Sequence, residues 1–569
     1  MNTIWRLALF AILAGACLGQ NRDAEFSKLA DRYYDELVFH FDPVQGTSAG
    51  FHQYDPLLPS GSRAEIDSQI AALKKWQGEI GRFDPRGLSA WAAADRELIA
   101  SAIDGQLLSL ESIRGWEKNP DNYSSGVTNA IFVIMSRNYA PAAERLRSVI
   151  ARERLIPRVF ASARENLKDP PQIYTEIALE QLPGLVSFFE KDVPLAFHEV
   201  KDSQLMSEFQ GSNQTVIRAL GDYGTWLKGD LLPRSHGDFR IGAENYRKKL
   251  LYDEMVDIPL DRLVAIGFED LRRNQAEFRR VAAQIDAKRA LQQVLEEVER
   301  DHPSGDRLLQ AFRDILGSLR AFIEQHHIVT IPSQVLPILE QSPPFMRALT
   351  TASMDTPGPY EKDKEAFFNV TLPDPRWPPK QKEEYLEDFN RGTIISTATH
   401  EAYPGHYVQF LWLQSVSTKV RKLTAGGSNA EGWAHYSEQM MLDEGYGGGD
   451  PKLRLGQLED ALLRNARYLA GIQMHTGKMT FAEAVDFFVK EGYQPRPIAE
   501  KEAKRGTSDP TYLVYTLGKR EILKLREDYR KLKGPQYSLG EFHDAFMRQG
   551  APPIKIVRRA LLENDSPVL

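Results

Sequence analysis

The sequence has 569 residues, of which 42% are hydrophobic and 26% charged, and its formal net charge is −7. This composition is typical of a globular protein with ample apolar material for a large core, and it excludes a disordered or fibrous chain. Lys and Arg are scattered along the sequence rather than clustered. A nucleic-acid partner is therefore not expected, because binding one requires a concentrated basic face.

Residues 1–19 have the order of features that is typical of a secretory signal peptide. Arg6 is followed by the apolar run Leu7–Ala16, and small residues then lead to Gln20. The run is too short to span a bilayer, and no later segment approaches about twenty consecutive apolar residues. We therefore expect an exported protein, periplasmic or extracellular, that has no membrane span.

Cys17 is the only cysteine, so an internal disulfide is excluded. The segment Ala-Gly-Ala-Cys that ends at Cys17 approximates a lipoprotein cleavage box, although Ala14 stands where a larger aliphatic residue is expected. Simple export is favoured, and a membrane-anchored lipoprotein with its lipid at Cys17 is the alternative.

Residues 20–330 form a predicted helical N-terminal part. Apolar residues at three- and four-residue spacing predict helices over Ala24–Phe39, Ser60–Ile80, Ala90–Leu110, Pro141–Leu167, Tyr174–Phe189, Asp202–Leu227 and Pro259–Ile285. Pro141 and Pro259 suit a first helical position, whereas Pro157 should kink or divide its segment. The pattern leaves open whether this part is a separate domain.

Residues 331–569 form the predicted catalytic, metal-binding part, which we expect to continue the fold of the preceding region. Ten of the 33 prolines fall between positions 332 and 379, which rules out a long helix there. Within that stretch Ala366–Leu372 alternates and predicts a short strand. The helical periodicity of apolar residues returns after Lys380, with interruptions at Gly445–Pro451 and Gly492–Pro497. The fold class is therefore mainly α, a large multi-helical body with one small β element.

Two runs carry most of the chemical information: T-H-E-A-Y-P-G-H-Y-V-Q at Thr399–Gln409 and S-N-A-E-G-W-A-H-Y-S-E at Ser428–Glu438. Imidazole and carboxylate are ligands that zinc accepts, and a hydrolytic site needs three protein ligands and an open position. His400, His406 and one acid of the second run would supply these ligands. Glu401 would be the base that takes a proton from water.

The spacing of the two histidines imposes a condition on this hypothesis. Six residues on an ideal helix correspond to a separation of about 120°, so a straight helix would not bring His400 and His406 to one metal. Pro404 and Gly405 lie between them and favour a broken turn. The site therefore requires a distorted helix at this point.

The second run predicts a helix with Ser428 or Asn429 as its N-cap that continues to about Glu444. One stripe of this helix carries Glu431, His435 and Glu438. Three polar groups on one stripe of an otherwise apolar helix favour a site over plain core packing.

The pattern H-E-A-x-P-G-H followed by E-G-W-A-x-Y resembles the bacterial domain-of-unknown-function family 885, which is treated as metallopeptidase-like. It is more distantly similar to the carboxypeptidase Taq family of helical zinc peptidases. The resemblance covers most of the mature chain, including Phe239–Arg247 and Tyr515–Gly518. It implies a zincin-like helical fold with the site in an internal cleft.

Residue by residue, the resemblance implies His400 and His406 as zinc ligands, Glu401 as base and Glu431 as third ligand. His435 departs from the family pattern, which has an apolar residue there more often. The choice between Glu431 and His435 as the third ligand therefore stays open.

Hydrolysis at zinc develops negative charge on the former carbonyl oxygen, so a hydrogen-bond donor is expected opposite the metal. The candidates are His475, Arg505, Tyr512 and Tyr515. The resemblance favours Tyr515, with His475 second, as catalytic groups. Arg505 is interpreted either as a clamp on a substrate carboxylate or as an ordinary surface arginine. Asp460 and Arg464 are expected to form an intrahelical pair.

These features predict a zinc-dependent peptidase or amidohydrolase that acts on short peptides. The alternatives are a metal hydrolase of non-peptide amides or esters, and a binding or scaffold protein with a relict site. For a peptide substrate, Phe368–Thr371 would pair with an extended chain, which makes Phe368, Asn369 and Val370 candidate substrate-binding residues. The alternative for this strand is a small structural hairpin.

Overall fold

The computed structural model describes residues 22–343, 347, 351–362 and 364–569. The predicted signal peptide, Cys17 included, lies outside the described residues. Within them, helices make up nearly all of the regular structure, and the strands form one three-stranded sheet. The predicted mainly-α fold with one small β element is therefore confirmed, whereas the zincin-like detail and the internal cleft stay predictions.

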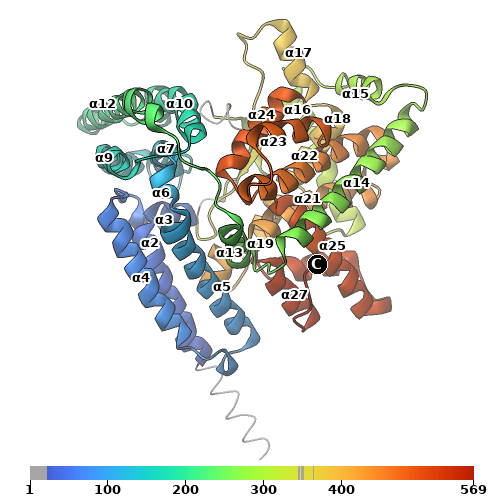
Figure 1. Ribbon diagram of the computed structural model, residues 1–569, viewed down its shortest axis with the longest axis horizontal. Coiled ribbons are helices and arrows are strands. Elements are labelled where there is room, and N and C mark those ends of the chain that lie inside the picture. The colour runs from blue at the N-terminus through green and yellow to red at the C-terminus, as the bar shows by residue number, and fades with distance from the viewer. Residues whose placement is uncertain (1–21, 344–346, 348–350, 363) are drawn as a thin grey trace, which may run out of the picture.

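The N-terminal helices lie on the left of Figure 1, coloured blue to green. Residues 22–33 are helical. The further helices of this part are η1 (Tyr34–Val38), α2 (Phe39–Phe41), α3 (Pro43–Ala49), η2 (His52–Tyr54), η3 (Pro85–Gly87), α4 (Arg63–Gly81), α5 (Ala90–Leu107), η4 (Leu108–Ile113), α6 (Gly115–Lys118), α7 (Asp121–Met135), α8 (Ala142–Glu153), α9 (Ile156–Asn166), α10 (Gln172–Ser187), η5 (Phe188–Asp192), α11 (Val193–Ala196), α12 (Ser203–Trp226), η6 (Leu227–Leu231) and η7 (Leu232–Arg234).

The remaining helices gather on the right of Figure 1, with α17 projecting at the top. They are α13 (Ala243–Glu254), α14 (Leu260–Ile285), α15 (Leu291–Glu299), α16 (Leu308–His326), α17 (Pro379–Glu387), α18 (Arg391–Glu401), α19 (His406–Leu413), α20 (Lys419–Leu423), α21 (Gly427–Asp443), η9 (Tyr446–Gly449), α22 (Pro451–His475), α23 (Phe481–Lys490), α24 (Arg496–Ser508), α25 (Val514–Lys533), η10 (Gly534–Gln536), α26 (Leu539–Met547) and α27 (Ile554–Leu562).

The prolines act largely as their chemistry predicts. The segment predicted to be divided by Pro157 is split into α8, which ends at Glu153, and α9, which begins at Ile156. Pro141 and Pro259, which were predicted as first helical residues, are instead the N-caps of α8 and α14, one position earlier in the helix. At both positions the missing N–H costs nothing, because no helical carbonyl precedes it.

The sheet has the strand order β1-β3-β2 and consists of β1 (Ile338–Gln341), β2 (Ala352–Asp355) and β3 (Phe367–Val370). β3 is the predicted strand, one residue shorter at its start and two at its end. It pairs in parallel with β1 and antiparallel with β2. The sequence did not predict β1 and β2, which are four residues long and lie in the proline-rich stretch.

Helix α21 is buried at the centre of the largest apolar cluster, which also includes residues of α18, α19, α25 and α26. Trp433 is fully buried, and its Nε1–H donates to the Pro404 carbonyl at 2.8 Å. α21 also packs closely on α25, since a Cβ on Gly432 would lie only 2.5 Å from the Cα of Gly518. α21 thus packs against α25 and is hydrogen-bonded to the break between α18 and α19.

The start of α21 differs from the prediction. The helix begins at Gly427 with Gly426 as N-cap, so the expectation of Ser428 or Asn429 as the cap is wrong. Glu254, from the end of α13, accepts hydrogen bonds from the Gly427 and Ser428 N–H groups, each at 2.9 Å. A carboxylate that is remote in sequence thus replaces the local capping side chain and interacts favourably with the positive end of the helix dipole.

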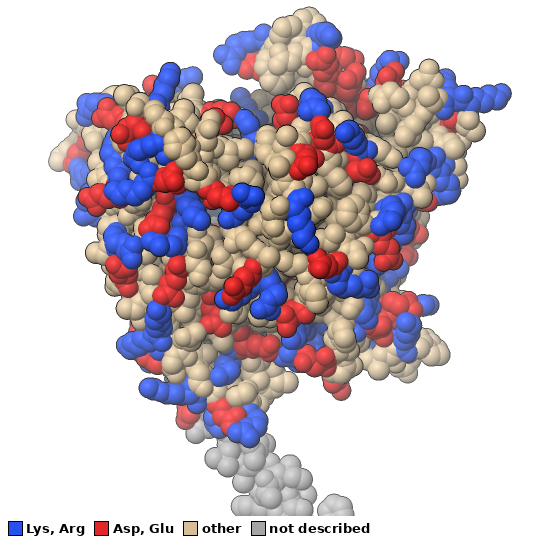
Figure 2. Space-filling model, in the orientation of Figure 1, with Lys and Arg blue, Asp and Glu red and all other residues tan. Residues whose placement is uncertain are grey.

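Charged side chains of both signs are interspersed on the face of the molecule that Figure 2 presents. Among the described residues, no helix combines the length and the hydropathy that a membrane crossing requires.

Candidate metal centre

The helix that carries His400 breaks where the sequence requires it to break. α18 ends at Glu401 and α19 begins at His406, and a cis peptide bond joins Tyr403 to Pro404 between them. As a result, the rings of His400 and His406 lie with their centroids 4.8 Å apart. The predicted distortion is confirmed.

Gly405 is the residue that makes this break possible. Its N–H donates to the Thr399 carbonyl at 3.0 Å. A Cβ at this position would lie 1.8 Å from the His400 carbonyl oxygen, far inside van der Waals contact. Only glycine therefore allows the chain to fold back onto the last turn of α18.

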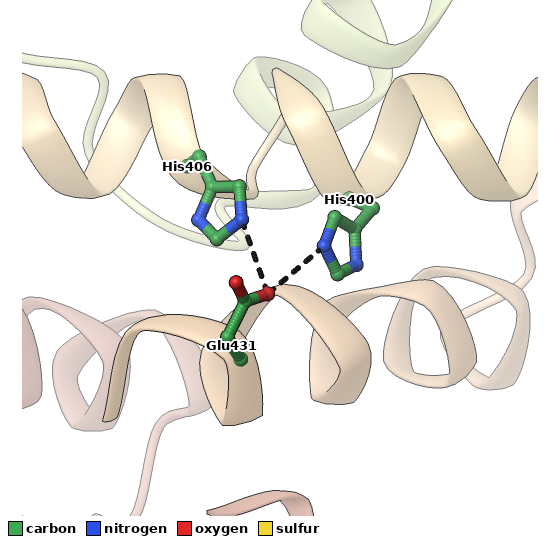
Figure 3. Close-up of side chains that lie close together, drawn as sticks. All are labelled: His400, His406 and Glu431. Atoms are coloured by element: carbon green, nitrogen blue, oxygen red, sulfur yellow. Dashed lines mark ion pairs between the residues drawn. The ribbon is translucent and has the colours of Figure 1, made fainter. Parts of the chain in front are cut away.

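Glu431 of α21 completes a group of three possible metal ligands (Figure 3). Its Oε2 lies 3.3 Å from His400 Nε2 and 3.4 Å from His406 Nε2, and the ligand atoms of the three residues are all within 4.8 Å of one another. Among the described residues this is the only group of at least three His, Cys, Asp or Glu side chains that could hold a metal.

The two distances from Glu431 Oε2 fit the geometry of a tetrahedral zinc site. With bonds of about 2.1 Å, two ligand atoms on a tetrahedral ion lie about 3.4 Å apart. Both distances from Glu431 Oε2 match this edge, and this oxygen is buried without a hydrogen-bond partner. The donor set, two imidazole nitrogens and one carboxylate oxygen, is one that zinc accepts with a fourth position left for water.

Of the two candidates for the third ligand, the structure brings Glu431 to the histidines and not His435. His435 is fully buried, and its Nδ1 lies 2.9 Å from Glu438 Oε2. Burial lowers the pKa of His435 to about 3 and outweighs the nearby carboxylate. His435 is therefore a neutral side chain behind the centre.

Glu438 is a residue whose role the sequence left unassigned. It is buried, and its Oε1 lies 2.7 Å from His400 Nδ1 and 3.0 Å from the Arg464 guanidinium. A carboxylate on Nδ1 fixes the imidazole tautomer that leaves Nε2 free to bind a metal. The stripe Glu431, His435, Glu438 was the sequence signal that could have identified it.

Arg464 also forms the predicted intrahelical pair, because its Nη1 lies 3.7 Å from Asp460 Oδ1. Its closer partner is Glu438, so this arginine neutralises a carboxylate that would otherwise be buried unpaired.

The electrostatics of the centre favour positive charge. Burial opposes the imidazolium form of His400, but Glu431 and Glu438 outweigh it and raise its pKa to about 10. Burial likewise opposes the carboxylate of Glu431, but the two histidines hold its pKa well below the usual range. A field that retains a proton on His400 also stabilises a cation bound in its place.

Glu401 follows His400 directly and belongs to the last turn of α18. Its Oε2 accepts a hydrogen bond from the Met354 N–H of β2 at 3.0 Å. The edge strand of the sheet therefore fixes the orientation of the predicted base.

Tyr515 lies beside the centre, as predicted. Its ring is nearly parallel to that of His400, at an interplanar angle of 22°, with the centroids 6.2 Å apart. Burial, followed by the charge of Glu431, raises the pKa of Tyr515, so the phenol carries its proton at neutral pH. Arg505 approaches the same phenol, with an Nη2–Oη distance of 3.4 Å, and its side chain is 42% exposed.

The structure does not bring His475 to this centre. Its Nε2 contacts the Gly506 carbonyl at 2.8 Å, and its ring packs edge-on against Phe239. Eleven residues of helix separate it from Arg464, which corresponds to about 16 Å along α22. None of these contacts connects His475 to the three candidate ligands, so its catalytic role stays a prediction.

The predicted peptide-pairing role of Phe368, Asn369 and Val370 is wrong. Both edges of β3 are already hydrogen-bonded to neighbouring strands, and Phe368 and Val370 are fully buried. The sequence analysis did not reveal this, because it did not predict the two short flanking strands.

Comparison with known proteins relates most of the chain to one family. The sequence profile of DUF885, a bacterial protein family of unknown function, matches residues 43–561. No curated protein matches the chain.

Two solved structures are similar over nearly the full length. One is described as a "putative lipoprotein of unknown function" from Shewanella oneidensis; it is 27% identical, with a TM-score of 0.79 over 94% of this chain and 99% of that chain. The other is a "putative lipoprotein" from Colwellia psychrerythraea, 17% identical, with a TM-score of 0.78 over 95% of this chain and 99% of that chain. The second likeness concerns the fold alone.

Proposed function

This chain belongs to the DUF885 family, and we propose that it is a zinc-dependent hydrolase that cleaves short peptides. One observation carries the proposal: two imidazole nitrogens and a carboxylate oxygen lie within 4.8 Å of one another, and both distances from the carboxylate oxygen match the edge of a tetrahedral zinc site. His400, His406 and Glu431 would hold the ion. When bound there, zinc would act as a Lewis acid and lower the pKa of a bound water.

The side chains of the site have complementary tasks in this reaction. Glu401 accepts the proton of the attacking water and passes it to the leaving amine. The hydrogen bond from the Met354 N–H restricts the orientation of this carboxylate. Glu438 holds His400 in the tautomer whose Nε2 is free.

Tyr515 donates its phenolic proton as a hydrogen bond to the oxygen that becomes negatively charged during hydrolysis. The raised pKa of Tyr515 supports this role, because the group must be protonated to donate. Arg505, beyond the phenol, is the candidate for binding a substrate carboxylate, since its side chain is partly exposed and its contact to Asp509 is long, at 3.4 Å.

An extended substrate fits β2 better than β3. β2 is an edge strand of the sheet, and its four residues are all partly exposed. Restricted access supports short peptides over folded proteins, because the side chains of His406 and Glu431 are only 13% and 29% exposed.

Export to the periplasm or the cell exterior is part of the proposal. It is supported by the N-terminal sequence pattern and by the description of the similar structure from Shewanella oneidensis as a putative lipoprotein. Cys17 is then the candidate lipid-anchor site, and N-terminal analysis of the mature protein tests it.

The activity test combines metal analysis with three matched substitutions. The wild type should bind one zinc and cut peptides in a library. Glu401→Gln should keep the zinc and lose at least about a hundredfold in kcat, because it removes the proton acceptor. Glu431→Gln should lose zinc affinity, and the exposed Glu444→Gln on the same helix should behave as the wild type.

Full activity of Glu401→Gln, or unchanged zinc affinity of Glu431→Gln, would contradict the assigned roles. A protein that hydrolyses simple amides or esters but no peptide would be a metal hydrolase of a different substrate class.

A further inference from the structure

The chain between β2 and β3 leaves the sheet and lies against the N-terminal helices. The Tyr360 N–H donates to the Ala49 carbonyl at 3.0 Å, and the rings of Phe51 and Tyr360 lie 4.7 Å apart. Gly50 has a φ of 99°, and a Cβ there would lie 2.4 Å from the backbone N of Glu361. The two backbones are therefore in direct contact at this crossing.

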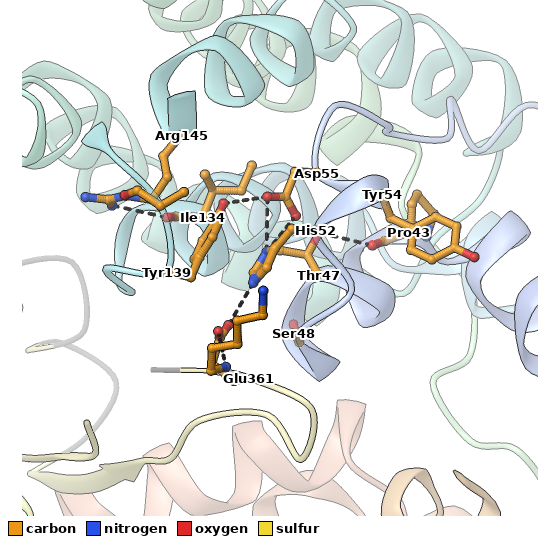
Figure 4. A network of polar contacts seen from close by, with 12 residues as sticks. Pro43, Thr47, Ser48, His52, Tyr54, Asp55, Ile134, Tyr139, Arg145 and Glu361 are labelled. Carbon is orange, nitrogen blue, oxygen red and sulfur yellow. Dashed lines mark hydrogen bonds and ion pairs between the residues drawn. The ribbon is translucent and has the colours of Figure 1, made fainter. Parts of the chain in front are cut away.

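A buried polar network reinforces the crossing (Figure 4). His52 Nε2 lies 3.0 Å from Glu361 Oε2, and His52 Nδ1 lies 3.2 Å from Asp55 Oδ2. The ring is stacked on Tyr139 with centroids 3.4 Å apart, and the Tyr139 hydroxyl donates to Asp55. The side chains of Glu361 and Asp55 are only 4% and 3% exposed, so an imidazolium between them is a shielded ion pair.

A second connection reaches β2 itself. Arg137, between α7 and α8, forms an ion pair with Asp355, the last residue of β2, and donates to the Glu365 carbonyl at 2.5 Å. Its side chain is only 8% exposed, and its guanidinium lies over the ring of Phe367. Both ends of the β2–β3 connection are thus tied to the N-terminal helices.

β2 is in turn the strand that orients the candidate base, because its Met354 N–H donates to Glu401 Oε2. We propose that His52, Glu361 and Arg137 are positioning residues, through which the N-terminal helices hold β2 so that Met354 keeps Glu401 aimed at the metal centre. The catalytic meaning of Glu401 rests on the proposed function, whereas the hold on β2 does not.

The chain offers a matched control for this arrangement. Lys504 of α24 and Glu180 of α10 form another ion pair between the N-terminal helices and the C-terminal part, at 2.7 Å. This pair does not involve the β2–β3 connection. Its loss should therefore weaken the contact between the two parts without releasing β2.

The experiment is hydrogen exchange followed by mass spectrometry on the zinc-loaded full-length chain, together with kcat, KM and zinc content. Glu361→Gln and His52→Gln should each accelerate hydrogen exchange over residues 352–362 about tenfold. This acceleration corresponds to about 1.4 kcal/mol. Their double variant should show little further acceleration, because both remove one interaction. kcat should fall while zinc content and KM stay unchanged, and Glu180→Gln should leave all four readouts as in the wild type.

Wild-type exchange over residues 352–362 in both single variants, or equal acceleration in Glu180→Gln, would overturn the proposal. Faster exchange with an unchanged kcat would also overturn it, since Glu401 would then not depend on β2. If the wild type hydrolyses no substrate, the proposed function fails. Hydrogen exchange of the Met354 amide then decides by itself whether the N-terminal helices hold β2 in contact with Glu401.

Discussion

Replacement of Glu438 by Gln should weaken zinc binding and destabilise the metal-free protein, although Glu438 is not one of the three candidate ligands. The carboxylate lies against His400, His435 and Arg464 at 2.7, 2.9 and 3.0 Å. A glutamine of the same shape has one acceptor oxygen, and its amide group would face an imidazole N–H or the guanidinium. The variant therefore cannot satisfy all three neighbours.

The magnitude follows from these contacts. Removing the charge of a buried ion pair leaves the Arg464 guanidinium with Asp460 alone, at 3.7 Å. Breaking such a pair costs about 3–5 kcal/mol. Because Asp460 still pairs with Arg464, we expect the free energy of unfolding to fall by about 3 kcal/mol. Loss of a carboxylate behind a metal-binding imidazole lowers metal affinity about 10- to 100-fold.

Denaturant unfolding of the metal-free protein and zinc competition with a chromophoric chelator measure the two effects. Glu459→Gln is the control, because burial and the neighbouring acids Glu299 and Asp460 raise the pKa of Glu459 to about 8. That carboxyl is protonated at pH 7, so glutamine resembles it closely. Zinc affinity of Glu438→Gln equal to that of the wild type would refute the tautomer argument.

Three further predictions test the break in the helix and two titratable groups. Gly405→Ala should lower the unfolding free energy by about 3 kcal/mol and weaken zinc binding, since its Cβ would clash with the His400 carbonyl. Burial raises the pKa of Glu153 to about 8, above its ordinary 4.5, so wild-type stability should fall as the pH rises from 4.5 to 8. Glu153→Gln should abolish this slope and raise the free energy of unfolding by about 3 kcal/mol at pH 8. Burial disfavours the His52 imidazolium, but its two carboxylate partners outweigh it and raise its pKa from 6.5 to about 9. Its stabilisation should be complete below pH 6.5 and lost as the pH rises through 9, so His52→Gln should cost about 1–2 kcal/mol only at the lower pH.

Each of these predictions has a control or a contradicting result. Gly78→Ala lies in α4 with open space at its Cβ and should be neutral or slightly stabilising; equal destabilisation by both alanines would contradict the role of Gly405. A wild-type pH slope that persists in Glu153→Gln would assign the slope to other groups. An effect of His52→Gln that is the same at pH 6 and pH 10 would show that the imidazole is not charged.

Much of the fold could be predicted because its signals are local. Periodic apolar spacing predicted several long helices, such as α12 and α14, and Pro157 marked a division between α8 and α9. The N-cap of α21 could not be predicted, since Glu254 acts from a position 173 residues before Gly427. The pairing of both edges of β3 could not be predicted either, because β1 and β2 become strands through pairing rather than through their own sequence pattern.

The candidate ligands could be predicted, whereas the groups that orient them could not. His400, His406 and Glu431 are ligand types in two compact runs, with Pro404 and Gly405 marking the break. Met354 acts through its backbone N–H, which any residue except proline supplies, so no side chain marks it. The contact between His52 and Glu361 spans 309 positions and likewise has no local signal.

Glu438 lies between these two cases, because a local pattern pointed to it. Seven residues separate it from Glu431, about 10 Å along one face of α21. His400 lies across that face with Glu431 3.3 Å from its Nε2 and Glu438 2.7 Å from its Nδ1. The separation of Glu431 and Glu438 along α21 therefore lets one imidazole lie between them, with a carboxylate at each of its nitrogens. Two acids seven apart on a helix, opposite the histidine of an H-E pair, thus predict both a metal ligand and the carboxylate that orients the other ligand.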